Sequence, residues 1–131
     1  MGYTRYWTRT EKPITDEYID FIQRLVIECR NQGIKLGNGV GEGNPVITEN
    51  AIVFNGNAKK GLDHESFYIS NDAEELGNFQ FCKTARKPYD YAVRLALEEA
   101  EHQKLVTKVH SDGDNNSLIS DEDYLNGNFG D

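Results

Sequence analysis

The sequence predicts an α+β fold: a mostly antiparallel sheet of about five to six strands, with two helices packed on one face. Two segments have the apolar spacing of an amphipathic helix, and several short segments show the alternation of a strand. The strand patterns cluster between the two helices instead of alternating with them, which favours antiparallel pairing. With 131 residues, the chain has the usual size of one domain.

The first strand is predicted at residues 3–9, where aromatic and β-branched residues alternate with polar ones. The first helix follows from about residue 16 to Gln32, because Thr15 can cap its start and Gly33 can end it in a left-handed conformation. The apolar stripe of this helix contains Tyr18, Ile22, Leu25 and Cys29, with Ile19, Phe21 and Val26 beside it.

A short extended run at 34–36 leads into residues 37–45, where closely spaced glycines predict a loop. Further strands are predicted at 51–54, 64–69 and 79–84, and Asn-Gly after the first of them marks a turn.

The second helix begins near Pro88, which suits the first turn of a helix. Its stripe is the cleanest in the chain, and consists of Tyr89, Ala92, Val93, Ala96, Leu97 and Ala100. A last strand is predicted at 105–110, so that residues 1–113 form a single domain.

Residues 114–131 are predicted to be an acidic, flexible tail. The formal charge of −8 is concentrated there: residues 111–131 hold six of the 22 acidic residues and no lysine or arginine. Residues 1–110 contain the remaining 16 acidic residues and 14 basic ones. Their net charge is therefore near −2, which allows a positive patch on this part of the chain.

The two cysteines, Cys29 and Cys82, suggest buried thiols in a reducing compartment rather than a disulfide framework. No apolar stretch approaches the length of a membrane span. We therefore expect a cytoplasmic protein that binds no membrane, and the sequence is compatible with a homo-oligomer.

The main candidate site is a basic segment that passes from the strand at 79–84 into the second helix. Cations at a helix start oppose the helix dipole, so an anion could complete this site; otherwise the charges simply point to solvent. The predicted ligand-binding residues are Lys83, Thr84, Arg86, Lys87, Tyr89 and Asp90.

The first strand extends this hypothesis. Arg5 and Trp7 share one face with Tyr3 and Arg9, and alternating aromatic and basic side chains can stack bases and hold phosphates. The alternative is that the aromatic residues belong to the core and the arginine stems cover them.

His64 and Glu65 offer a general base or acid beside the site, with His64 also a candidate ligand contact. A histidine at a strand edge is more often structural, so we expect a binding protein rather than an enzyme. If the protein is an enzyme, these two residues would be catalytic.

The tail segment from Asp112 partly matches a calcium loop, with oxygen ligands at Asp112, Asp114, Asn116 and Asp123. The sixth position is Ser117, where such loops need glycine for a sharp turn. No cofactor is therefore expected, and calcium at the tail remains the alternative.

The chain resembles a family of small, largely unannotated proteins of phages and bacteria. The resemblance rests on Tyr-x-Arg-Tyr-Trp at 3–7, Phe-Asn-Gly at 54–56, His-Glu-x-Phe at 64–67, Phe-Cys-Lys-Thr-Ala-Arg-Lys-Pro-Tyr-Asp at 81–90 and Ser-Asp-Gly at 111–113. It implies a phage-type accessory protein that works in the host cytoplasm, and it implies no particular chemistry.

Three functions are compatible with these patterns. The first is an accessory, anti-defence protein that sequesters an anionic, nucleotide-like small molecule at the basic turn. The second is an acidic inhibitor of a host nucleic-acid enzyme or defence protein, which would act through the tail. The third is a hydrolase or phosphodiesterase that uses His64 and Glu65.

Overall fold

The computed structural model describes residues 3–71 and 79–112. The strands are β1 (Thr4–Arg9), β2 (Val46–Ile47), β3 (Ala51–Phe54), β4 (Phe67–Ser70), β5 (Phe79–Lys83) and β6 (Val106–Ser111). The helices are α1 (Asp16–Asn31), α3 (Asp90–His102) and the short 3₁₀ helix η1 (Ala58–Lys60). This composition confirms the α+β class.

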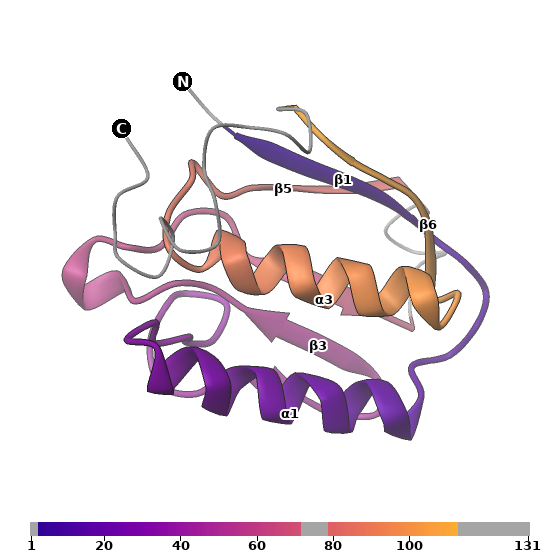
Figure 1. Cartoon of the computed structure of the whole chain (residues 1–131), viewed down its shortest axis with the longest axis horizontal. Coiled ribbons are helices and arrows are strands. Elements are labelled where there is room, and N and C mark those ends of the chain that lie inside the picture. The colour runs from indigo at the N-terminus through magenta and orange to yellow at the C-terminus, as the bar shows by residue number, and fades with distance from the viewer. Residues whose placement is uncertain (1–2, 72–78, 113–131) are drawn as a thin grey trace.

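The strands form two antiparallel three-stranded sheets, ordered β5-β1-β6 and β2-β3-β4. The antiparallel pairing was predicted, but the division into two sheets was not. Hydrophobic alternation identifies strands without saying which strands pair, so the expected continuous sheet could not be distinguished from two small ones. Figure 1 shows β1, β5 and β6 along one side of the molecule, and α1 along the opposite side.

The two helices lie side by side and run in opposite directions (Figure 1). The Tyr18 hydroxyl of α1 donates to the Ala96 carbonyl of α3 at 2.8 Å, and the Thr15 hydroxyl donates to the Gln103 side chain. The predicted cap of α1 is confirmed, because Thr15 also accepts a hydrogen bond from the Tyr18 amide. Helix α3 begins at Asp90, two residues after Pro88.

The predicted apolar stripes of both helices are buried in a single core. The core continues through β1, β3 and β4, where Trp7 packs on Phe67 with ring centroids 5.3 Å apart, and Phe67 packs on Phe54 at 4.8 Å. Cys29 and Cys82 are both buried and unpaired. The core therefore lies between the helices and the inner faces of the two sheets.

Strand β1 is the centre of its sheet, and its two faces differ in burial. Arg5, Trp7 and Arg9 point inward and are at most 7% exposed, whereas Tyr6 and Thr8 lie on the outer face and are half-buried. Strand β6 pairs with β1 through a register shift opposite Trp7.

Neither of the two described α-helices is long and apolar enough to cross a bilayer. The predicted tail at 114–131 lies outside the described residues, as do Asp114, Asn116 and Asp123 of the calcium hypothesis.

Candidate functional site

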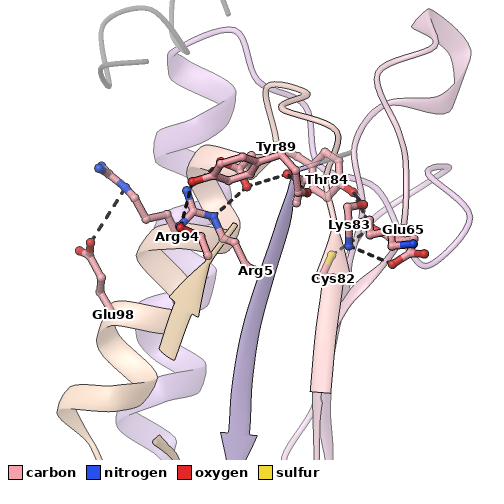
Figure 2. A network of polar contacts seen from close by, with 11 residues as sticks. Arg5, Glu65, Cys82, Lys83, Thr84, Tyr89, Arg94 and Glu98 are labelled. Carbon is pink, nitrogen blue, oxygen red and sulfur yellow. Dashed lines mark hydrogen bonds and ion pairs between the residues drawn. The ribbon is translucent and has the colours of Figure 1, made fainter. Parts of the chain in front are cut away.

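A buried ion pair joins the first strand to the second helix. The Arg5 guanidinium donates through Nε to Asp90 Oδ1 at 2.8 Å and through Nη2 to Oδ2 at 2.9 Å. Asp90 is fully buried, and Arg5 is 7% exposed. Thr84, which is also buried, donates its hydroxyl to Asp90 Oδ1 at 2.7 Å (Figure 2). Such a two-pronged pair fixes orientation as well as distance.

A second group of polar contacts joins Tyr89 and the end of β5 to Glu65. The Tyr89 hydroxyl and the Cys82 thiol both donate to the Glu65 carbonyl oxygen, and the Glu65 carboxylate accepts from the Lys83 amide at 2.9 Å. Burial raises the pKa of Cys82 to about 12 and raises the pKa of Tyr89 as well. Both groups are therefore neutral donors at physiological pH and hold the end of β5 against the segment before β4.

These contacts place several residues of the predicted site inside the protein. The sequence left Arg5 and Trp7 open between a base-stacking face and a position in the core, and both side chains point into the protein. Arg5 is occupied by Asp90, and Trp7 is 1% exposed. Thr84 and Asp90 belong to this buried ion pair and Tyr89 to the adjoining group of contacts, so Arg5, Thr84, Tyr89 and Asp90 hold the turn from within. Trp7 packs on Phe67 in the core.

The cations Lys83 and Arg86 of the turn have different surroundings. Lys83 is exposed on the outer face of β5, while the Arg86 guanidinium lies 4.7 Å from the centre of the Tyr3 ring. Lys87 is half-exposed, and its amide donates to the Thr84 carbonyl at 3.0 Å to close the turn. Arg5 lies near the same ring, with its guanidinium 5.3 Å from the Tyr3 ring centre, and is paired with Asp90.

The turn itself is strained. Ala85 and Arg86 have φ angles of 53° and 58°, in the left-handed region that side chains rarely adopt. Positive φ at both central residues is the pattern of a type I′ turn, where Asn-Gly is usual. The bond from the Lys87 amide to the Thr84 carbonyl closes the turn around these two residues, and strained backbone of this kind clusters at functional sites.

His64 and Glu65 are both exposed. The His64 backbone is fixed by the Asn55 side chain, which accepts from its amide at 3.0 Å and donates to its carbonyl at 2.8 Å. The Glu65 carboxylate already accepts the Lys83 amide. The backbone of this pair is therefore held by the side chains of Asn55, Cys82 and Tyr89.

Asp112 is the one proposed calcium ligand within the described residues, and it accepts a hydrogen bond from the Tyr6 hydroxyl at 2.8 Å. No cluster of three or more His, Cys, Asp or Glu side chains suited to a metal is found in residues 3–71 and 79–112.

The structure contains a groove that the sequence did not predict. A hollow of about 400 Å³ lies between the end of α1, η1 and the start of α3, and a second of about 360 Å³ adjoins it at Lys35, Asn57 and Lys59. We call this pair of hollows the lysine groove. Its charged lining residues are Lys35, Lys59, Lys60 and Glu42, and its apolar wall contains Ile34, Leu62, Pro88 and Tyr89.

Glycines form the tight parts of this groove. A Cβ atom on Gly56 would lie 2.0 Å from the Leu62 carbonyl oxygen and 2.9 Å from the Tyr89 ring. Gly41, with φ +77°, would place a Cβ 2.7 Å from the Gly56 carbonyl oxygen. Only glycine allows these backbone segments to approach so closely, which keeps the groove walls in position.

The groove shares Pro88 and Tyr89 with the predicted basic turn, and so lies directly beside it. Its lysines come from two separate segments, one after α1 and one in η1. The sequence signal was weak: Lys59-Lys60 follows an Asn-Gly turn, and such a lysine pair is ordinary on a protein surface.

Comparison of the chain with protein-family models, with curated proteins and with solved structures finds no match.

Proposed function

We propose that this chain is a phage-type accessory protein that binds an anionic, nucleotide-like small molecule in the lysine groove. The observation that carries the proposal is a hollow with three lysines on its lining and one glutamate, in a chain whose formal charge is −8. Positive charge gathered in a concave site raises the local concentration of anions.

The lining suits a ligand with a charged part and a flat apolar part. Lysine ammonium groups bind phosphates as point charges, and they lie beside an apolar wall formed by Leu62, Pro88 and Tyr89. The two volumes, about 400 and 360 Å³, fall in the range of small-molecule sites and are too small for a folded partner.

The buried network supports this role without touching the ligand. The Tyr89 hydroxyl donates a hydrogen bond to the Glu65 carbonyl, which restrains the position of the Tyr89 ring in the groove wall. Asp90, the next residue, is anchored by Arg5. A wall fixed in this way loses little conformational entropy on binding, which favours affinity. No catalytic group is required for a protein that sequesters a ligand.

The phage-type part of the proposal rests on the resemblance of residues 3–113, and the anti-defence role follows from it as a hypothesis. In that role the protein would remove a host nucleotide signal by holding it. The binding experiment addresses the narrower chemistry of a phosphate-bearing ligand in the lysine groove.

The test begins with native mass spectrometry of the full chain purified from cells, followed by thermal shift with a panel of linear and cyclic nucleotides. A ligand at 100 times its Kd stabilises the fold by about 2.7 kcal/mol, which is readily seen as a higher Tm. Lys59→Glu/Lys60→Glu should weaken the affinity by at least ~10-fold, because it replaces attraction by repulsion at the phosphates.

The matched control is Lys104→Glu/Lys108→Glu, which makes the same charge change at exposed lysines outside the groove. It should retain binding. If both double variants lose affinity equally, the effect belongs to net charge and the groove is not the site. If no phosphate ligand shifts the Tm of the wild-type chain, the proposed function is wrong.

A further inference from the structure

A second exposed feature lies on the outer face of the β5-β1-β6 sheet, away from the core. Tyr6 of β1 pairs in register with Phe81 of β5 and His110 of β6, and Thr8 pairs with Phe79. Phe79 and Phe81 are 57% and 51% exposed, unusual values for phenylalanine in a folded domain. We call Tyr6, Phe79, Phe81 and His110 the aromatic face.

The rings of this face contact one another. Tyr6 stacks on His110 with centroids 4.7 Å apart and on Phe79 at 6.0 Å, and it lies 6.5 Å from Phe81. The Tyr6 hydroxyl donates to Asp112 at 2.8 Å, which fixes the tilt of the central ring. The result is a row of aromatic rings across three strands, whose positions are fixed by contacts among themselves and with Asp112.

The charges around this face are also unusual for the chain. Strands β1, β5 and β6 contain no aspartate or glutamate, although 22 of the 131 residues are acidic. Lys83 follows Phe79 and Phe81 on the same face of β5, and Lys108 is exposed in β6. Asp112 is at the rim, where its carboxylate is bound by Tyr6.

We infer that the aromatic face binds single-stranded nucleic acid, with bases stacked on Tyr6, Phe79 and Phe81 and the backbone phosphates held by Lys83. Aromatic rings on an open sheet accept unpaired bases of any sequence, since every base has a π-face. Strands without carboxylates reduce repulsion of the backbone, and the Asp112 carboxylate at the rim is bound by Tyr6. DNA and RNA share this chemistry, so the test includes both.

The inference also revises the base-stacking hypothesis drawn from the first strand. The sequence pointed to Trp7 and Arg5, which face inward, whereas the neighbouring residue Tyr6 lies half-buried on the outer face. The lysine groove does not contribute any residue to this face, so the two sites are separate in the structure.

The experiment is fluorescence anisotropy of the full chain with labelled dT20, rU20 and a 20-base-pair duplex, at low and at moderate salt. We expect binding to one or both single strands, weaker binding to the duplex, and affinity that falls as salt rises. Phe79→Ala/Phe81→Ala should weaken binding by about 10-fold or more, since stacking contributes about 1–3 kcal/mol per base.

Two controls separate this site from the rest of the surface. Ile27→Ala removes an exposed apolar side chain that is 54% exposed on α1, and Lys59→Ala/Lys60→Ala removes charge in the lysine groove. Both should bind like the wild type. Because the phenylalanines are half-exposed, the double variant should also keep its circular dichroism spectrum and Tm.

Three results would overturn the inference. The first is the absence of binding to either single strand at low salt. The second is binding that the Phe79→Ala/Phe81→Ala variant retains in full. The third is a wild-type chain that binds no nucleic acid and sediments as a dimer, while the Phe79→Ala/Phe81→Ala variant sediments as a monomer. The occupant of the aromatic face would then be a second copy of the chain. None of these results bears on nucleotide binding in the groove, which Lys59→Glu/Lys60→Glu tests by itself.

Discussion

The two faces of strand β1 carry similar chemistry and have different roles. The inner face presents Arg5, Trp7 and Arg9, and each arginine is satisfied there: Arg5 by Asp90, and Arg9 by the carbonyl oxygens of Ser70 and Leu105. The outer face presents Tyr6 among exposed rings. Aromatic and cationic side chains alone therefore do not distinguish a structural face from a recognition face.

The difference between the faces is what covers them. Asp90 of helix α3 forms an ion pair with Arg5 on the inner face, and this pair holds strand β1 to the helix. In residues 3–71 and 79–112, no helix packs on Phe79 or Phe81, which remain half-exposed. A cation that is buried and paired stabilises orientation, whereas an exposed ring beside a lysine stays available to a partner.

The largest expected effect comes from breaking the inner pair. Arg5→Met leaves the buried Asp90 carboxylate without its cation, and we expect the free energy of unfolding to fall by about 3–5 kcal/mol. Urea denaturation followed by circular dichroism measures this loss. On the outer face, Phe81→Ala should change stability by no more than ~0.5 kcal/mol, as for other surface positions.

A double variant sharpens this comparison. Arg5→Met/Asp90→Leu removes both charges, so most of the lost stability should return, because an uncompensated charge is no longer buried. If Arg5→Met alone costs as little as Phe81→Ala, then the pair does not hold β1 to α3, and the contrast between the two faces fails.

Alkaline pH tests the burial of the two cysteine thiols without changing a residue. Burial raises the pKa of Cys29 and Cys82 to about 12, above the ordinary thiol value of 9.0. The unfolded thiols ionise first as pH rises, so their contribution to stability is complete below pH 9 and is lost between about 9 and 12. At pH 10 the ionisation of the two thiols in the unfolded chain should lower the free energy of unfolding by about 3 kcal/mol in total.

The measurement is a series of urea titrations from pH 7 to 10, with Cys29→Ala/Cys82→Ala as the control. The control should be less stable at neutral pH and show a shallower decline above pH 9. A wild-type stability that stays constant from pH 8 to 10 would mean that the native thiols ionise as easily as exposed ones, against their burial.

Local patterns predicted the elements that depend on local rules. The Thr15 cap, the stripe of α1 and the strand at 51–54 are confirmed, because capping and periodicity are properties of neighbouring residues. Which side of β1 faces the core was left open by the sequence for the opposite reason. Alternation states that Arg5 and Trp7 share a side, but only the position of α3 decides that this side is inside.

The candidate sites differ in the same way. The basic turn was visible as one continuous segment, although Thr84, Tyr89 and Asp90 within it are buried. The lysine groove joins Lys35, Lys59 and Pro88, which are far apart in the chain and meet only through the packing of α1, η1 and α3. A site assembled by tertiary contacts has no spacing that a sequence can display.

The smallest predicted effect on stability concerns the turn between strand β5 and the buried residue Asp90 at the start of α3. Ala85 has a φ of 53°, which costs an L-residue roughly 1–2 kcal/mol and costs glycine nothing. Glycine also gains freedom in the unfolded chain, which offsets part of the benefit. We therefore expect Ala85→Gly to raise the free energy of unfolding by about 0.5–1 kcal/mol, measured as a higher urea midpoint at constant m-value.

Arg86→Gly is the matched comparison at the next position, where φ is 58°. It relieves similar strain, but it also removes the guanidinium that lies 4.7 Å from the Tyr3 ring centre. A cation–π contact at a partly exposed site is worth about 0.5–1 kcal/mol, so the two terms should cancel. If Ala85→Gly lowers stability instead, the turn is not strained, and the network around Asp90 does not hold Ala85 against its preference.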